Sequence, residues 1–175
     1  MKVHLCIRNE SQRKRVYRTT ELRHLAERVC SGEGVDEDIE LSVLLCDDPF
    51  IRDLNRTYRN KDAITDVLAF CQTPVEHPIG SAGPDPIVLG DIVISLESVE
   101  RYCRAEMPNG HPTGSPRAAM RKELRLLFCH GLLHLLGSDH TTAQARTEMN
   151  ARQAHYLGTT MQAAWRTRAN TPRGR

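Results

Sequence analysis

Three histidines in the C-terminal third of the chain have the spacing of a metal site. They stand in the run His130-Gly-Leu-Leu-His134-Leu-Leu-Gly-Ser-Asp-His140, at positions i, i+4 and i+10. Because residues four apart lie on one face of a helix, the imidazoles of His130 and His134 can converge on a point about 2 Å from each. Gly137 can take the left-handed conformation that ends a helix, and the chain can then reverse and bring in His140. Three histidines and an open fourth position are typical of a catalytic zinc site, because the metal activates a water there.

The residue after the first histidine separates this site from those of metalloproteases. The run matches the pattern H-E-x-x-H-x-x-G-x-x-H at every defined position except the second, where Gly131 replaces the glutamate that serves as general base. This argues against an ordinary peptidase mechanism. The missing side chain leaves room for a bulky substrate or for a closely packed strand beside the metal, or it relieves crowding between helices, and the sequence leaves these explanations open. We expect one zinc ion per chain, since neutral imidazoles suit zinc, although nickel and copper fit the same ligands in vitro.

Length and composition indicate one folded domain. The chain has 175 residues, 39% of them hydrophobic, which is enough for a core when the apolar residues are periodic. No stretch approaches the 18 consecutive apolar residues of a membrane span, and the N-terminus lacks the features of a signal peptide. We therefore expect a cytoplasmic protein with no membrane partner. The six cysteines are dispersed without a C-x-x-C pair, so we expect buried small side chains and no disulfide framework.

The net charge of +2 conceals an uneven distribution along the chain. Residues 1–35 carry 8 Lys and Arg against 4 Asp and Glu, residues 36–110 carry 6 against 15, and residues 111–175 carry 10 against 3. Basic ends of this kind suit the phosphate backbone of a nucleic acid, but they are equally typical of a solvated surface. The charge pattern alone does not decide between the two.

The hydrophobic pattern predicts the elements that must position the histidines. Four segments read as strands, over residues 3–8, 39–46, 67–71 and 87–94, and the last two are close enough to pair antiparallel. Five segments are predicted to be helices: one around residues 22–29, one that opens at Asp48-Pro49 with Asp48 as its N-cap, one over 95–107, one from Ser115-Pro116 to Gly137, and one from a Thr141–Gln144 capping box to about residue 157. This order predicts an α+β fold with a sheet of about four strands and about five helices. We expect the domain to occupy residues 1–165, followed by a basic, disordered tail over 166–175.

Three blocks of the sequence resemble the YbeY family of endoribonucleases and rRNA maturation factors. The histidine run resembles the family signature H-G-x-L-H-L-x-G-x-D-H. The block Tyr58-Arg-Asn-Lys-Asp-Ala-Ile-Thr-Asp-Val-Leu-Ala-Phe70 resembles Y-R-x-K-D-x-x-T-D-V-L-S-F, and Leu89-Gly-Asp-Ile-Val-Ile94 resembles L-G-D-I-x-I. The blocks stand in the family's order, and the resemblance covers about residues 3–157. The departures are small, with Ala69 in place of Ser and Cys71 in place of Pro.

The resemblance implies a mixed sheet, a zincin-like histidine helix beneath a cleft, and cleavage of single-stranded RNA. His130 and Arg59 are then the candidate catalytic residues. Arg59 and Lys61 are the candidate substrate-binding residues, because a guanidinium binds phosphate through two hydrogen bonds and keeps its charge. Without the resemblance, the simpler interpretation of Arg59 is a cation favoured at a helix C-terminus by the helix dipole. Asp139 is expected to accept a hydrogen bond from a ligating imidazole, or else to act as a base.

Three functions remain open at this stage. The first is a zinc-dependent endoribonuclease acting on single-stranded rRNA, which by resemblance would mature small-subunit rRNA, take part in ribosome quality control and meet the ribosome and its assembly factors. The second is a non-catalytic assembly factor in which the zinc ion has a purely structural role, and the third is a peptidase or other hydrolase. Structural zinc normally has four protein ligands, and the sequence offers three good ones, which favours the first function.

Overall fold

A four-stranded mixed sheet organises the molecule. The computed structural model describes residues 1–13, 16–72, 85–106, 115–138 and 140–165. The strands are β1 (Val3–Asn9), β2 (Ile39–Cys46), β3 (Val67–Cys71) and β4 (Ile87–Ser95), in the order β1-β2-β4-β3. β1, β2 and β4 run parallel to one another. β3 lies at the edge of the sheet, and its antiparallel pairing with β4 confirms the prediction from the sequence.

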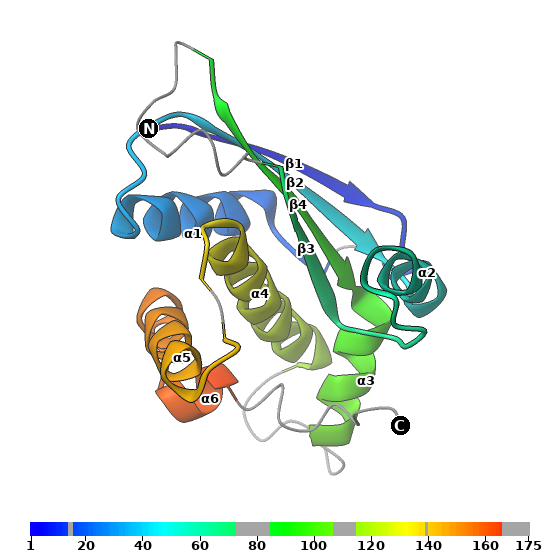
Figure 1. Cartoon of the computed structure of the whole chain (residues 1–175). Coiled ribbons are helices and arrows are strands. Elements are labelled where there is room, and N and C mark those ends of the chain that lie inside the picture. The colour runs from blue at the N-terminus through cyan, green and yellow to red at the C-terminus, as the bar shows by residue number, and fades with distance from the viewer. Residues whose placement is uncertain (14–15, 73–84, 107–114, 139, 166–175) are drawn as a thin grey trace.

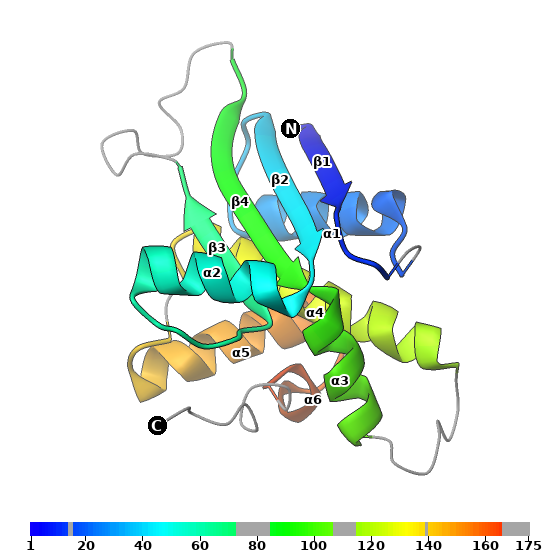
Figure 2. The same ribbon diagram turned by 90° about the vertical axis from the view of Figure 1, so that its right-hand side faces the viewer.

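The helices lie on both faces of this sheet. α1 (Thr19–Gly32) and α4 (Pro116–Leu135) pack on one face, and α5 (Ala143–Leu157) and the short α6 (Met161–Trp165) lie beyond α4 (Figure 1). α2 (Asp48–Arg59) covers part of the opposite face, and α3 (Leu96–Glu106) continues from the end of β4 (Figure 2). The five expected helices are therefore present in the described part of the chain, and α6 is an addition to them.

The strand sequences explain the two-sided sheet. In β2 the alternate residues Ile39, Leu41, Val43 and Leu45 are buried in the main core, while their neighbours Glu40 and Ser42 are exposed. This alternation is typical of a strand with one face toward the core. On the other face, α2 covers a smaller apolar cluster that includes Ile51, Leu68 and Val93.

α4 is the central helix of the helical layer. Ser115 caps its start, where the Ser115 Oγ accepts a hydrogen bond from the Ala118 N–H at 3.3 Å, as the Ser-Pro pair predicts. From Leu126 to Leu133 every residue is buried, because the sheet, α1 and α5 surround this half of the helix. A helix that is buried all round holds its side chains in fixed positions, which suits a ligand-bearing element.

Two predicted helix starts differ from the observed ones. α2 begins at Asp48 itself, and its carboxylate accepts hydrogen bonds from Ser95, Ser98 and Arg101 instead of capping the helix. α5 is capped by Thr142, whose Oγ1 accepts a hydrogen bond from the Ala145 N–H at 3.1 Å, so the Thr141–Gln144 capping box is wrong. Local cap motifs were misplaced by one residue, while the helices themselves were predicted correctly.

The predicted fold class is confirmed. Within the described residues, no helix is both long enough and apolar enough to cross a membrane. The expected tail over 166–175 lies outside the described residues.

Candidate metal centre

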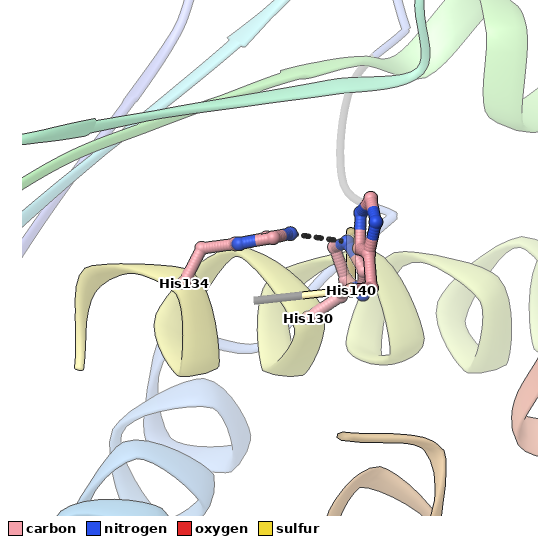
Figure 3. Close-up of side chains that lie close together, drawn as sticks. All are labelled: His130, His134 and His140. Carbon is pink, nitrogen blue, oxygen red and sulfur yellow. Dashed lines mark hydrogen bonds between the residues drawn. The ribbon is translucent and has the colours of Figure 1, made fainter. Parts of the chain in front are cut away.

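The three predicted histidines come together in space. The ring centroids of His130 and His134 are 4.5 Å apart, those of His134 and His140 4.9 Å, and those of His130 and His140 5.5 Å. The candidate ligand nitrogens all lie within 4.8 Å of one another. Figure 3 shows the three rings gathered on the side of α4 that faces the sheet. Nitrogens 2.0–2.1 Å from a tetrahedral zinc are about 3.3 Å apart. The Nε2 atoms of His130 and His134 are 2.9 Å apart, so this donor set fits a zinc ion with small adjustments.

A glycine turn brings the third histidine back to the helix. Gly137 has a φ of 86°, in the left-handed region that glycine tolerates. The Gly137 N–H donates to the His134 carbonyl at 3.0 Å, and the Ser138 N–H donates to the Leu133 carbonyl at 2.9 Å. These two bonds form a Schellman motif, which satisfies the last carbonyls of α4 and reverses the chain. The predicted role of Gly137 is therefore confirmed.

Gly131 lies against a strand of the sheet. A Cβ atom at this position would meet the Cγ2 of Ile92 at 2.9 Å and its Cδ1 and Cγ1 at 3.3 Å. Ile92 is fully buried in β4. Close packing against a strand, one of the explanations that the sequence left open, is therefore observed. The glycine lets α4 approach the sheet at the level of the two histidines that flank it.

A buried glutamine contacts the Nδ1 atom of the first histidine. The His130 Nδ1 is 3.1 Å from the Oε1 of Gln153 on α5, and the Gln153 Nε2 donates to the Ala164 carbonyl on α6 at 2.6 Å. His130 is 3% exposed and Gln153 is 0% exposed. No sequence motif marks Gln153, because it meets His130 only when α5 packs on α4.

The histidines line a pocket of about 150 Å³ whose other wall comes from the end of α2 and from β3. This pocket contains Arg59, which the sequence had singled out 71 positions before His130. Asp66, at the start of β3, also lines it. The described lining residues are Arg59, Thr65, Asp66, Val67, Ala69, His130, Gly131, His134 and His140. The tertiary structure thus brings the expected cation and the three imidazoles to one cavity.

Arg59 differs from the other arginines of α2 in its electrostatic surroundings. Arg52 makes two hydrogen bonds to Asp62, at 2.6 and 3.0 Å, and Arg56 pairs with Asp53 at 3.0 Å. Among the described residues, Arg59 has no ion-pair partner. Its exposed guanidinium is therefore available for an anionic ligand.

The other candidate residues, Lys61 and Asp139, and two further polar residues are described next. Lys61 is exposed just after α2, outside the set that lines the pocket. Asp139 lies outside the described residues. Asp91 accepts a hydrogen bond from Gln72 and is not among the pocket-lining residues. His155 is exposed on the last turn of α5 and is not part of the histidine cluster.

Comparison with known proteins gives a consistent result. The family model described as Endoribonuclease YbeY matches residues 6–161. Endoribonuclease YbeY of Pelotomaculum thermopropionicum is 37% identical over 137 residues, which cover 78% of this chain and 82% of that protein. Endoribonuclease YbeY of Moorella thermoacetica is 39% identical over 139 residues, with coverage of 78% and 82%.

A solved structure supports the fold. The solution structure of TM1509 from Thermotoga maritima aligns with a TM-score of 0.55 and 24% sequence identity, over 98% of this chain and 99% of that one. At this identity the likeness concerns the fold alone.

Proposed function

Because this chain belongs to the YbeY endoribonuclease family, we propose that it is a metal-dependent endoribonuclease that cleaves single-stranded RNA. One observation carries the proposal: an arginine with no ion-pair partner among the described residues lines the same pocket as the three histidines. A metal centre and a cation suit the cleavage of a phosphodiester, because the metal can activate a nucleophile and the cation can bind the charged phosphate.

His130, His134 and His140 would hold one zinc ion, with His130 as the most deeply buried ligand. When bound, zinc supplies a Lewis acid for a phosphoryl oxygen and lowers the pKa of a bound water toward neutrality. This chemistry needs no strong protein base, which is consistent with Gly131 at the position where peptidases carry a glutamate.

Arg59 would bind the phosphate and stabilise the negative charge that develops on its oxygens. A planar guanidinium offers two parallel N–H donors to a phosphate and does not lose its proton at any relevant pH. Lys61, two residues further on, would contact a neighbouring phosphate of the RNA. Asp66 is the described carboxylate that lines the pocket, and we assign it a supporting role in orienting polar groups of the substrate.

The substrate within this class would be ribosomal RNA. The family membership supports a role in maturation of small-subunit rRNA and in ribosome quality control, with the ribosome and its assembly factors as partners. The basic ends of the chain would contribute contacts to the RNA backbone.

The Arg59→Ala variant tests this function. It should keep its fold and one zinc per chain, as measured by circular dichroism and metal analysis, while cleavage of single-stranded RNA falls by about 100-fold or more, as is typical when one charge-stabilising donor is removed. Arg56→Ala is the matched control, since Arg56 lies on the same helix but is paired with Asp53. His134→Ala should lose both the metal and the cleavage.

Two results would contradict the proposal. If Arg59→Ala cleaves RNA at the wild-type rate, the assignment of the cation is wrong. If the zinc-loaded wild type binds rRNA but does not cleave it, and chelation leaves this unchanged, the chain is a binding factor with a structural metal.

A further inference from the structure

The hydrogen bonds that link His130, Gln153 and Ala164 have a defined donor and acceptor at each step. The Ala164 carbonyl is an acceptor only, so the group of Gln153 that lies 2.6 Å from it must be the amide NH₂. The amide oxygen of Gln153 then faces His130, where it must accept a hydrogen bond from the Nδ1 of that ring. Nδ1 therefore carries a proton.

From this direction we propose that Gln153 is a positioning residue that fixes the tautomer of His130, so that its Nε2 lone pair faces the metal. A neutral imidazole with a proton on Nδ1 has none on Nε2, and only an unprotonated nitrogen can ligate. The inference rests on the proposed metal centre, but it concerns a property of the protein that exists before the metal binds.

Burial makes this arrangement specific. Gln153 is 0% exposed, and its amide bridges His130 on α4 to Ala164 on α6. A flipped amide would set two acceptor oxygens against each other at the Ala164 side, with no solvent to relieve them. The packing of α6 against α5 thus selects the amide orientation, and the amide selects the histidine tautomer.

The arrangement also orients the second histidine. The Nε2 atoms of His130 and His134 are 2.9 Å apart, so one of them must donate a hydrogen bond when no metal lies between them. With the proton of His130 on Nδ1, the donor is the Nε2 of His134. When both rings are neutral, the metal-free protein should therefore hold them in opposite tautomers. Metal binding should then leave the Nδ1 proton of His130 in place and remove the Nε2 proton of His134.

A neutral amide has a further chemical consequence. Imidazole ligands of metals often donate to a carboxylate, which raises the basicity of the ligand. Gln153 fixes the ring in the same way without adding a negative charge beside the metal, so the electrophilic character of the ion is retained. This matters here because Gly131 leaves no glutamate on the adjacent turn to assist the nucleophile.

The Gln153→Met variant tests the inference, because methionine has a similar volume and no hydrogen-bonding amide. The nitrogen chemical shifts of the His130 ring in the metal-free protein report its tautomer. Wild type should show a protonated Nδ1 on His130, and Gln153→Met should show a mixture of tautomers or the Nε2–H form. Zinc affinity, measured by competition with a chelator, should fall by about 10–100-fold.

Tyr156→Phe is the matched control on the same helix. Its hydroxyl donates to the Glu33 Oε1 at 2.7 Å, away from the histidines, so the variant loses one polar contact of α5 without touching the site. It should retain the wild-type tautomer and zinc affinity. Gln153→Glu is the rescue variant, because its protonated carboxyl can donate to the Ala164 carbonyl while its other oxygen accepts from the His130 Nδ1–H. It should keep the Nδ1–H form, and it tests the inference if Gln153→Met folds poorly.

The outcomes separate this inference from the proposed function. A protonated Nε2 on His130 of the metal-free wild type, or a folded Gln153→Met protein that binds zinc as tightly as wild type, would overturn the positioning role. Absence of RNA cleavage by the zinc-loaded wild type would overturn the proposed function, and the tautomer measurement would still stand.

Discussion

The contact between Gly131 and Ile92 allows a quantitative test of how closely α4 packs against β4. In Gly131→Ala, the new methyl group lies 2.9 Å from the Ile92 Cγ2, and the buried isoleucine must shift. Overpacking of this kind costs about 1–3 kcal/mol. Alanine recovers about 1 kcal/mol of helix propensity relative to glycine. The variant should therefore be destabilised by a net value of about 0–2 kcal/mol.

A double-mutant cycle isolates the contact. Ile92→Ala removes Cγ1, Cγ2 and Cδ1, the three atoms that a Cβ at residue 131 would meet, and should cost about 2–5 kcal/mol through the cavity that it leaves. In that background the clash is gone, so Gly131→Ala should be neutral or stabilising by about 1 kcal/mol. The coupling energy between the two positions is then about 1–3 kcal/mol, which is the clash itself.

The assay is urea unfolding of the four proteins with a chelator present, so that metal binding does not contribute to the free energies of unfolding. Additive effects within about 0.5 kcal/mol would refute the reasoning, because they would mean that the two residues do not touch. A second measurement follows from the position of Gly131 between the histidines: zinc affinity should fall in Gly131→Ala and recover in the double variant.

Two further predictions concern stability and reactivity. Burial raises the pKa of Asp48, but hydrogen bonds from Arg101, Ser95 and Ser98 outweigh it and hold the pKa below the ordinary value of 3.8. The ionised carboxylate therefore stabilises the fold above pH 3.8, and this stabilisation is lost as the pH falls through the lower pKa of the folded state. Near neutral pH, Asp48→Asn should lower the free energy of unfolding by about 1–3 kcal/mol. This difference from wild type should shrink on acidification below about pH 4. Burial raises the pKa of Cys30, Cys46 and Cys103 to about 12, so in the native protein near neutral pH a maleimide should label the exposed Cys6 and Cys71 much faster than these three.

Each of these has a control. Asp53→Asn removes an exposed carboxylate that is paired within α2, and it should change the acid unfolding profile little; an equal effect of the two substitutions would contradict the role of the buried network. For the cysteines, mass spectrometry of labelled peptides gives the rates, and rapid labelling of Cys30 in folded protein would show that the core is open there.

The elements of the fold follow from local patterns. The alternation of Ile39, Leu41, Val43 and Leu45 predicted a strand with one buried face, and the structure confirms it. Ser115-Pro116 and Gly137 marked the two ends of α4, because a cap and a left-handed turn act within a few residues. The N-caps of α2 and α5 were each placed one residue too far along or too early. At α2 the carboxylate of Asp48 is held by residues of β4 and α3, and at α5 the neighbouring Thr142 caps the helix.

The sequence by itself determined the ligand set, because His130, His134 and the turn at Gly137 depend on one helix and its end. Only the tertiary structure decided how that set is used. It brought Arg59 to the pocket that the histidines line, packed Gly131 against Ile92 and placed the amide of Gln153 within hydrogen-bonding distance of His130. The physical reason is that helical periodicity is fixed over a few residues, whereas the approach of two elements depends on how all the side chains between them fill space.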